Sequence, residues 1–281
     1  MDVKGMLGRI AAAASSDDLV FPTTTEMALK LQRVLDNPDC SIDQLVKLVR
    51  ADPLLSARIV AVANSVTYNR SGRVIEDPKS AVSRIGFNTL RVLAAAVVVR
   101  QMEGMAHTPE HRQLAVRLWE HTAHVAALSQ VIARRVTHVN PDTAFFAGII
   151  HEVGGFYLIS RARDYPGLLE GERGSLLAWD EGGAAEVGRA VLARLGTPAT
   201  VTEAIEGMWQ GYLAMPPRSL ADTLLLADQL APVESPLSQL AGIGREGTEA
   251  RIDMALDDET LGSILTESAG EVESLIGALN A

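Results

Sequence analysis

The residues best suited to chemistry in this sequence are an adjacent histidine and glutamate, His151 and Glu152, in the stretch FFAGIIHEVGGFYLIS. They end an apolar run at helical spacing, which Asn140-Pro141 opens in the manner of an N-cap followed by a proline at the first helical position. Two glycines follow, and a second apolar face then begins. Because an unpaired buried carboxylate is costly, we expect Glu152 either to have a partner or to lie at the mouth of a cavity.

A second candidate is His121, on a helix predicted over about 109–136. Aliphatic residues at spacings of three and four form the inner stripe of this helix, and His121 lies within the stripe, one turn from His124. A lone histidine on such a face is usually a hydrogen-bonded core residue. The alternative is that His151 and Glu152 join it in a shared site.

The rest of the chain predicts short helices joined by tight connections, with no alternation that would indicate a sheet. Ser41 to Gln44 read as a capping box, and Asp77-Pro78 begins a helix that Gly86 ends. The predicted fold class is therefore all-α. Further helices are expected over 1–15, through Met27 to Leu35, after Asp52-Pro53, from Asn88, over 185–195, after Thr197-Pro198, over 220–231, and around 261–265 and 272–279.

Several segments, in order and spacing, resemble the HDOD family, the HD-related output domain of bacterial signalling proteins. These segments are Phe21-Pro22, Asp52-Pro53-Leu54, Ala63-Asn64-Ser65 with Tyr68, Ala81-Val82 with Ile85-Gly86, and Leu90-Arg91. HEVGG also resembles an altered form of the HDIGK signature of HD-domain metal phosphohydrolases, in which the adjacent His and Asp bind metal. The resemblance implies two packed helical subdomains, an HDOD N-terminal part over 16–107 and a degenerate HD-like part over 108–281, after a helical extension over 1–15.

The resemblance also implies which residues match the metal ligands of HD enzymes: His121, His151, Glu152 and Asp228. Two histidines and a carboxylate suit a divalent transition metal. Glu152, however, stands where HD enzymes have Asp, and its extra methylene displaces the carboxylate by about 1.5 Å, one C–C bond. Gly155 replaces a lysine that can hold phosphate. We therefore expect these residues to be vestigial, with no catalytic residue and no bound metal.

Other positions also depart from the family pattern by lacking histidines. Ala184 stands where many relatives carry a further histidine, and the segment Gly207-Met208-Trp209 stands where they often have a pair of histidines. Gly211-Tyr212 resembles a dipeptide of the GYP subfamily, but its neighbouring histidines are absent. These substitutions favour the loss of catalysis.

Composition and charge limit the classes of partner. The chain has 281 residues, is 47% hydrophobic and carries a net charge of −10. Residues 1–140 hold 17 basic against 13 acidic side chains, and residues 141–281 hold 8 against 22, so the halves carry +4 and −14. The strongly acidic second half repels the phosphates of a nucleic acid, and we therefore expect no nucleic-acid partner.

Cysteine usage and apolar runs bear on location. Cys40 is the single cysteine, which excludes an intrachain disulfide and fits a reducing compartment. The longest apolar runs, such as Val92–Val99, are far shorter than a membrane span. We expect a cytoplasmic protein that does not interact with a membrane.

Three functions follow from these observations. The leading one is a non-catalytic signal-transduction module that binds response-regulator or cyclic-dinucleotide-turnover modules in trans, or acts as a stand-alone adaptor. A homodimer is the assembly considered for it. The second is a metal-dependent phosphohydrolase that uses Glu152 in place of Asp, and the third is a sensor that binds a nucleotide without cleaving it. Arg70, Arg73 and Lys79 flank a polar loop over 66–77 and are the candidates for binding an acidic partner, the alternative being a solvated loop.

Overall fold

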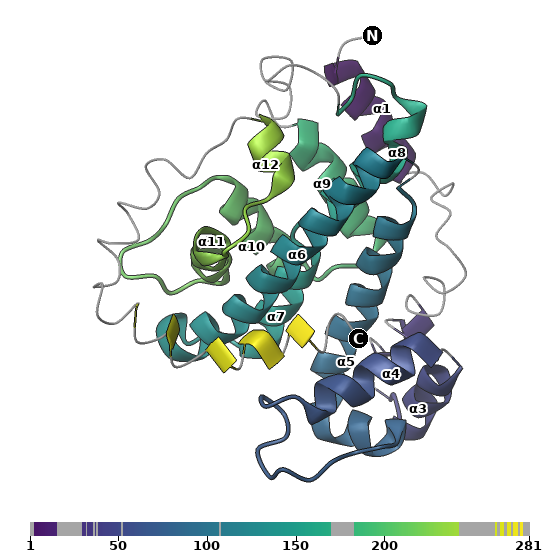
Figure 1. The fold of residues 1–281 in the computed structure, drawn as a ribbon, viewed down its shortest axis with the longest axis vertical. Helices are drawn as coiled ribbons and strands as arrows, with labels where there is room; N and C mark the ends of the chain where they lie inside the picture. The colour runs from purple at the N-terminus through teal and green to yellow at the C-terminus, as the bar shows by residue number, and fades with distance from the viewer. Residues whose placement is uncertain are drawn as a thin grey trace.

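The structure is a computed structural model that describes residues 3–15, 30–51 and 53–106, each with few or no gaps, 108–169, 183–241 and scattered positions between 262 and 277. The described residues form helices and no strand, which confirms the all-α prediction (Figure 1). The helices are α1 Val3–Ser15, α3 Ile42–Arg50, α4 Pro53–Asn64, α5 Pro78–Gly104, α6 Pro109–Ile132, α7 Pro141–Ile150, α8 Val153–Arg161, α9 Ala184–Arg194, α10 Ala199–Trp209, α11 Leu220–Leu230 and α12 Pro236–Ala241, with a π-helical turn over Ala133–Thr137 and a 3-10 turn over Ala162–Asp164.

Local capping begins four of these helices, α3, α5, α6 and α7, where the sequence predicts. The side chains of Asp77, Thr108 and Asn140 accept hydrogen bonds from backbone amides at the N-termini of α5, α6 and α7, and a proline follows each of them. Ser41 and Gln44 form the predicted capping box of α3. The entry of α10 differs, because Pro198 occupies the N-cap and no side chain caps this helix.

The expected helix end at Gly86 is present as a kink inside α5. Gly86 has φ 78° and ψ 174°, a conformation that glycine adopts without steric cost, and the helix resumes directly after it. The segment beyond the kink is almost wholly buried, since it runs through the centre of the molecule beside α4 and α7.

One continuous core joins the early and late helices. α1 packs on α9, α5 packs on both α4 and α7, and the main core cluster includes residues from α1 to α12. The division at residue 107 remains a prediction. The expected Phe21-Pro22 and Asp52 features, the boundaries at 16 and 107, and most of the predicted helices around 261–265 and 272–279 lie outside the described residues.

Two helical stretches, Pro78–Gly104 and Pro141–Asp164, are long and apolar enough to cross a membrane by length and composition. Their most apolar windows are 67% and 89% buried within the fold. Both stretches therefore have the character of core helices, and they are weak evidence for a membrane protein.

Helices α6 and α7 approach closely at Gly148. A Cβ at this position would lie 2.5 Å from the Ala126 Cα, a backbone atom that cannot move aside easily. We predict that Gly148→Ala lowers the free energy of unfolding by about 1–3 kcal/mol, because the extra methyl group overpacks this contact. Urea unfolding followed by circular dichroism measures the change.

Gly8→Ala is the matched control. Gly8 lies exposed in α1, and no atom lies within 4 Å of the position that a Cβ there would occupy. Alanine there should raise stability by about 0.5–1 kcal/mol, since glycine is a poor helix former. Equal effects of the two substitutions would contradict the tight α6–α7 contact.

Candidate functional site

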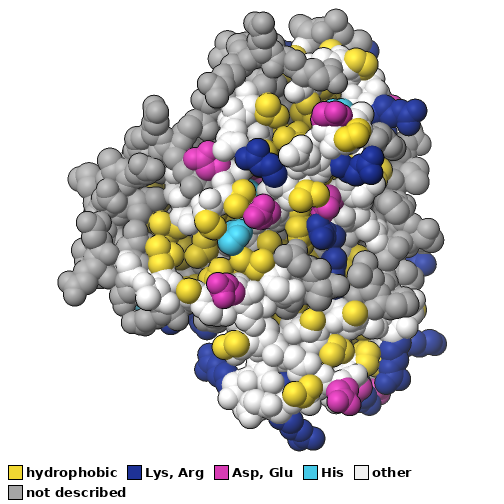
Figure 2. Space-filling model, viewed as in Figure 1, with side chains coloured by type: hydrophobic (Ala, Val, Ile, Leu, Met, Phe, Trp, Pro, Cys, Tyr) yellow, Lys and Arg dark blue, Asp and Glu magenta, His cyan; other side chains and the backbone are white. Residues whose placement is uncertain are grey.

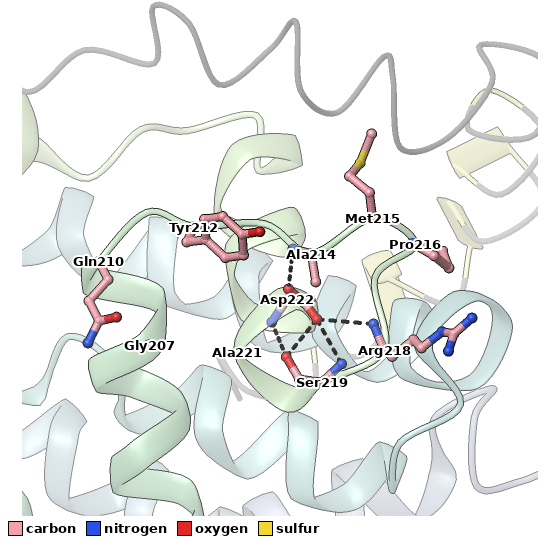
Figure 3. A pocket seen from close by; sticks show the side chains of 10 residues that line it. All are labelled: Gly207, Gln210, Tyr212, Ala214, Met215, Pro216, Arg218, Ser219, Ala221 and Asp222. Carbon is pink, nitrogen blue, oxygen red and sulfur yellow. Dashed lines mark hydrogen bonds between the residues drawn. The ribbon is translucent and has the colours of Figure 1, made fainter.

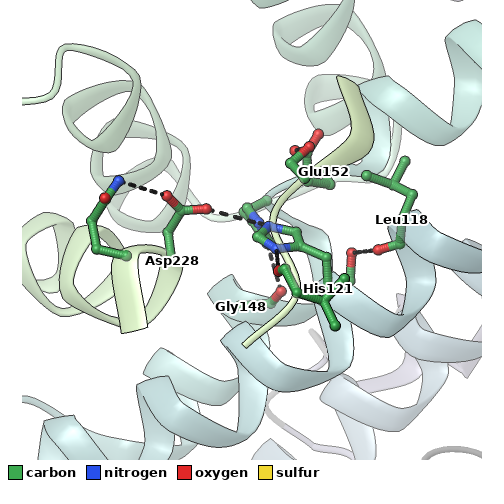
Figure 4. Close-up of polar contacts among 10 residues, drawn as sticks. Leu118, His121, Gly148, Glu152 and Asp228 are labelled. Carbon is green, nitrogen blue, oxygen red and sulfur yellow. Dashed lines mark hydrogen bonds and ion pairs between the residues drawn. The ribbon is translucent and has the colours of Figure 1, made fainter. Parts of the chain in front are cut away.

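Two buried imidazoles meet between α6 and α7. His121 comes from the middle of α6 and is 0% exposed, and His151 directly follows the last residue of α7 and is 3% exposed. Their Nε2 atoms lie 3.3 Å apart (Figure 4). The structure therefore unites two of the histidines that the sequence separates by 30 residues.

Backbone carbonyls fix the orientation of both rings. The Nδ1 of His151 lies 2.7 Å from the Gly148 carbonyl oxygen, and the Nδ1 of His121 lies 2.8 Å from that of Val233. A carbonyl only accepts, so each Nδ1 carries the proton and donates it. The two Nε2 atoms consequently face one another, and a proton on one of them is needed to join them in a hydrogen bond.

Asp228 on α11 supplies the charge that holds this proton. Its Oδ1 lies 3.3 Å from the Nε2 of His121. Burial opposes the charged form of His121, but the hydrogen bond and the charge of Asp228 outweigh burial and raise the pKa of His121. Burial and the neighbouring His121 lower the pKa of His151 to about 4. These shifts favour the charged form of His121 and the neutral form of His151.

Glu152 turns away from this cluster. Its Oε1 accepts a hydrogen bond from the Ser235 hydroxyl at 2.7 Å, and burial raises the pKa of its carboxyl group. Its Oε2 lies 2.9 Å from the position that a Cβ on Gly155 would occupy, so glycine leaves room for the carboxylate. The expected partner of Glu152 is thus a serine on the segment between α11 and α12.

Three of the four candidate ligands could hold a metal. One donor atom from each of His121, His151 and Asp228 lies within 4.8 Å of the other two. Two imidazoles that donate their Nδ1 protons to carbonyl oxygens and present Nε2 are typical of metal-binding histidines. The donor set therefore fits a divalent transition metal, whereas the Glu152 carboxylate points elsewhere.

The basic candidates lie around the 66–77 loop. Arg70, Arg73 and Lys79 are exposed. Lys79 pairs with Asp43 at 2.8 Å across the surface. None of the three belongs to the histidine cluster.

Sequence reasoning missed two features. Val233 and Ser235 close over the cluster from a connection that carries no recognisable motif. An open pocket of about 610 Å³ lies between α10 and α11, where Asp222 accepts hydrogen bonds from the amides of Ala214, Arg218 and Ser219 (Figure 3). The capping spacing of Ser219 and Asp222 was the signal that could have revealed this arrangement.

The ion pair predicts a pH-dependent stability in metal-free protein. A histidine with its pKa raised above the unfolded value of about 6.5 is stabilising below that pH, and the stabilisation is lost as the pH rises through the folded pKa. We predict that Asp228→Asn lowers the free energy of unfolding by about 2 kcal/mol at pH 6, and by less at pH 9. Chemical unfolding at several pH values measures the difference.

Asp43→Asn serves as the control, because this exposed carboxylate pairs with Lys79 and not with a histidine. Its effect should not change between pH 6 and 9. A stability difference for Asp228→Asn that is constant or grows with pH would show that His121 is not the group held by Asp228.

Comparison with known proteins places this chain in a family. The chain is 24% identical, with a TM-score of 0.71 over 99% of both chains, to a crystal structure from Shewanella amazonensis SB2B provisionally named a metal-dependent phosphohydrolase. It is 19% identical, with a TM-score of 0.60, to a provisionally named signal transduction protein from Marinobacter aquaeolei VT8, covering 100% of this chain and 67% of that one. Over 170 residues, 60% of the chain, it is 22% identical to an uncharacterized Treponema pallidum (strain Nichols) protein, of which it spans only 31%. The HDOD domain model matches residues 21–210, and the chain belongs to the HDOD domain family.

Proposed function

We propose that this protein is a non-catalytic signalling module of the cytoplasm that acts by binding other proteins. The observation that carries the proposal is the commitment of Glu152 to Ser235. Hydrolysis at an HD-type centre needs the acid of the doublet as a metal ligand and an open position for water. Here that acid is only partly exposed and is bonded to Ser235 on a neighbouring segment.

His121 and Glu152 have a structural role that accounts for their presence. The hydrogen bonds His121–Val233 and Glu152–Ser235 attach the connection between α11 and α12 to α6 and to the start of α8. Removing one partner from such a partly buried arrangement leaves a polar group unsatisfied, at a cost of about 1–3 kcal/mol. The former doublet thus stabilises the fold without any chemistry.

Family membership and similarity to a provisionally named signal transduction protein support the signalling context. Response-regulator and cyclic-dinucleotide-turnover modules in trans are the partners we propose. The pocket between α10 and α11 has the volume of a small-molecule site. We therefore propose it as the place where a nucleotide would bind as a regulator.

A second candidate function has its own supporting observation. His121, His151 and Asp228 present three donors that fit a divalent metal, so a metal-dependent phosphohydrolase would use Asp228 and not Glu152 as the carboxylate ligand. When bound, such a metal supplies a Lewis acid and an activated water. The chain's own contribution would be to orient both imidazoles through Gly148 and Val233.

Metal content and turnover, measured together, separate the two functions. The protein is purified without a His-tag or chelator, analysed for metals, and assayed with Mn²⁺ on bis(p-nitrophenyl) phosphate and a cyclic dinucleotide. We predict metal well below one ion per chain and no turnover above that of His151→Ala.

His124→Ala is the matched control, since His124 lies on α6 one turn from His121 and outside the metal-binding group. Near-stoichiometric metal and metal-dependent hydrolysis, both lost in His151→Ala and kept in His124→Ala, would overturn the non-catalytic proposal in favour of the phosphohydrolase.

A further inference from the structure

The 66–77 loop presents basic and apolar side chains together at one end of the molecule. Val66 and Val74 are 64% and 67% exposed, among the most exposed large hydrophobic residues described. Arg70 and Arg73 lie between them in sequence and are also exposed. At the lower tip of Figure 2, where Figure 1 places this loop, blue and yellow side chains lie next to each other.

The two ends of the loop are closed by side chains of the neighbouring helices. The Asn64 amide donates to the Ile75 carbonyl at 2.7 Å and accepts from the Ile75 amide at 2.8 Å. Arg84 donates to the carbonyl oxygens of Ala63 and Arg73, at 3.1 and 2.9 Å. Closed ends of this kind are characteristic of a compact Ω-loop.

Tyr68 attaches the loop to the helical core. Its hydroxyl accepts from Gln130 on α6 at 3.0 Å, lies 3.1 Å from Thr89 on α5 and donates to Asp142 on α7 at 3.3 Å. A loop fixed at its base and its middle presents its tip in one conformation. Binding to such a pre-organised surface loses little conformational entropy.

Both arginines are exposed in the part of the chain that the structure describes. Neither guanidinium forms an ion pair with a described residue, in contrast to Lys79, whose ammonium is paired with Asp43. Arg70 lies within a turn closed by the hydrogen bond from the Gly72 amide to the Asn69 carbonyl, and Arg73 follows that turn. The planar guanidinium binds carboxylates in a bidentate manner, and nearby exposed valines suit an apolar side chain.

The acids of the loop lie at its base. Asp77 accepts from the Ser80 amide as the N-cap of α5, and Glu76 precedes it. Over the whole chain the net charge is −10, which repels a nucleic acid at long range. An acidic protein segment needs only the local contact, so the charges favour a peptide over a polyanionic duplex.

We propose that Arg70, Arg73, Val66 and Val74 form a docking surface for an acidic segment of a partner protein that also carries aliphatic or aromatic side chains. The proposal rests on the proposed function, because it names the surface through which a non-catalytic module would bind. It assigns the binding role to the loop and leaves the histidine cluster as part of the scaffold.

A random 12-residue peptide library displayed on phage, selected on the purified full chain at 150 mM salt, tests the proposal. We predict enrichment of peptides rich in Asp, Glu, Leu and Phe. Their affinity, measured by fluorescence anisotropy, should fall at least tenfold in Arg70→Glu/Arg73→Glu and at least threefold in Val66→Ser/Val74→Ser. Asn64→Ala, which frees the loop without removing a contact side chain, should weaken binding to an intermediate degree.

Arg112→Glu is the matched charge reversal, on the exposed face of α6, and should change the affinity less than twofold. All variants should keep the wild-type melting temperature except Asn64→Ala. Recovery of no acidic peptide, or equal losses in Arg112→Glu, would overturn the proposal. So would tighter binding of a 20-base-pair duplex with the same dependence on Arg70 and Arg73, which would identify a nucleic-acid surface.

The two proposals fail separately. Metal-dependent turnover would overturn the non-catalytic function and leave the peptide result unchanged. A peptide affinity that does not change with the loop substitutions would overturn the docking surface and leave the turnover result unchanged.

Discussion

The close approach of α6 and α7 at Gly148 is the constraint on which the centre of the molecule depends. The absent Cβ lets the Ala126 backbone pack against this position, and the Gly148 carbonyl accepts the Nδ1 proton of His151. One residue therefore sets both the separation of the helices and the direction of an imidazole. His121 can face His151 at 3.3 Å only because the helices are this close.

A buried polar cluster formed in this way stabilises the fold only while each member is satisfied. His121 contacts Val233, His151 and Asp228 through its two nitrogens, and Glu152 has Ser235. Replacing such a cluster by apolar residues is often neutral, whereas removing one partner is strongly destabilising. The main role of the cluster is thus to fix how α11 packs against α6 and α7, and its net contribution to stability is small.

Sequence predicted the elements well and the site in part. Helix starts follow local rules, so Asp77, Thr108 and Asn140 could be identified as caps from their neighbours alone. The convergence of His121, His151 and Asp228 followed only from the family resemblance. The partner of Glu152 could not be predicted, because Ser235 is 83 residues away and its position depends on how the connection after α11 folds back. The pairing of Lys79 with Asp43, 36 residues apart, is likewise a product of packing.

Tyr68 connects the helical interior to the surface loop over 66–77. Its hydroxyl bonds to residues of α5, α6 and α7, the helices that surround the histidine cluster or lead into it. Because burial raises its pKa to about 12, Tyr68 stays neutral and keeps the hydroxyl proton that it donates to Asp142. Any change in the spacing of these helices would therefore alter the anchoring of the loop. The geometry of the histidine cluster and the anchoring of the 66–77 loop are therefore linked through a single hydroxyl group.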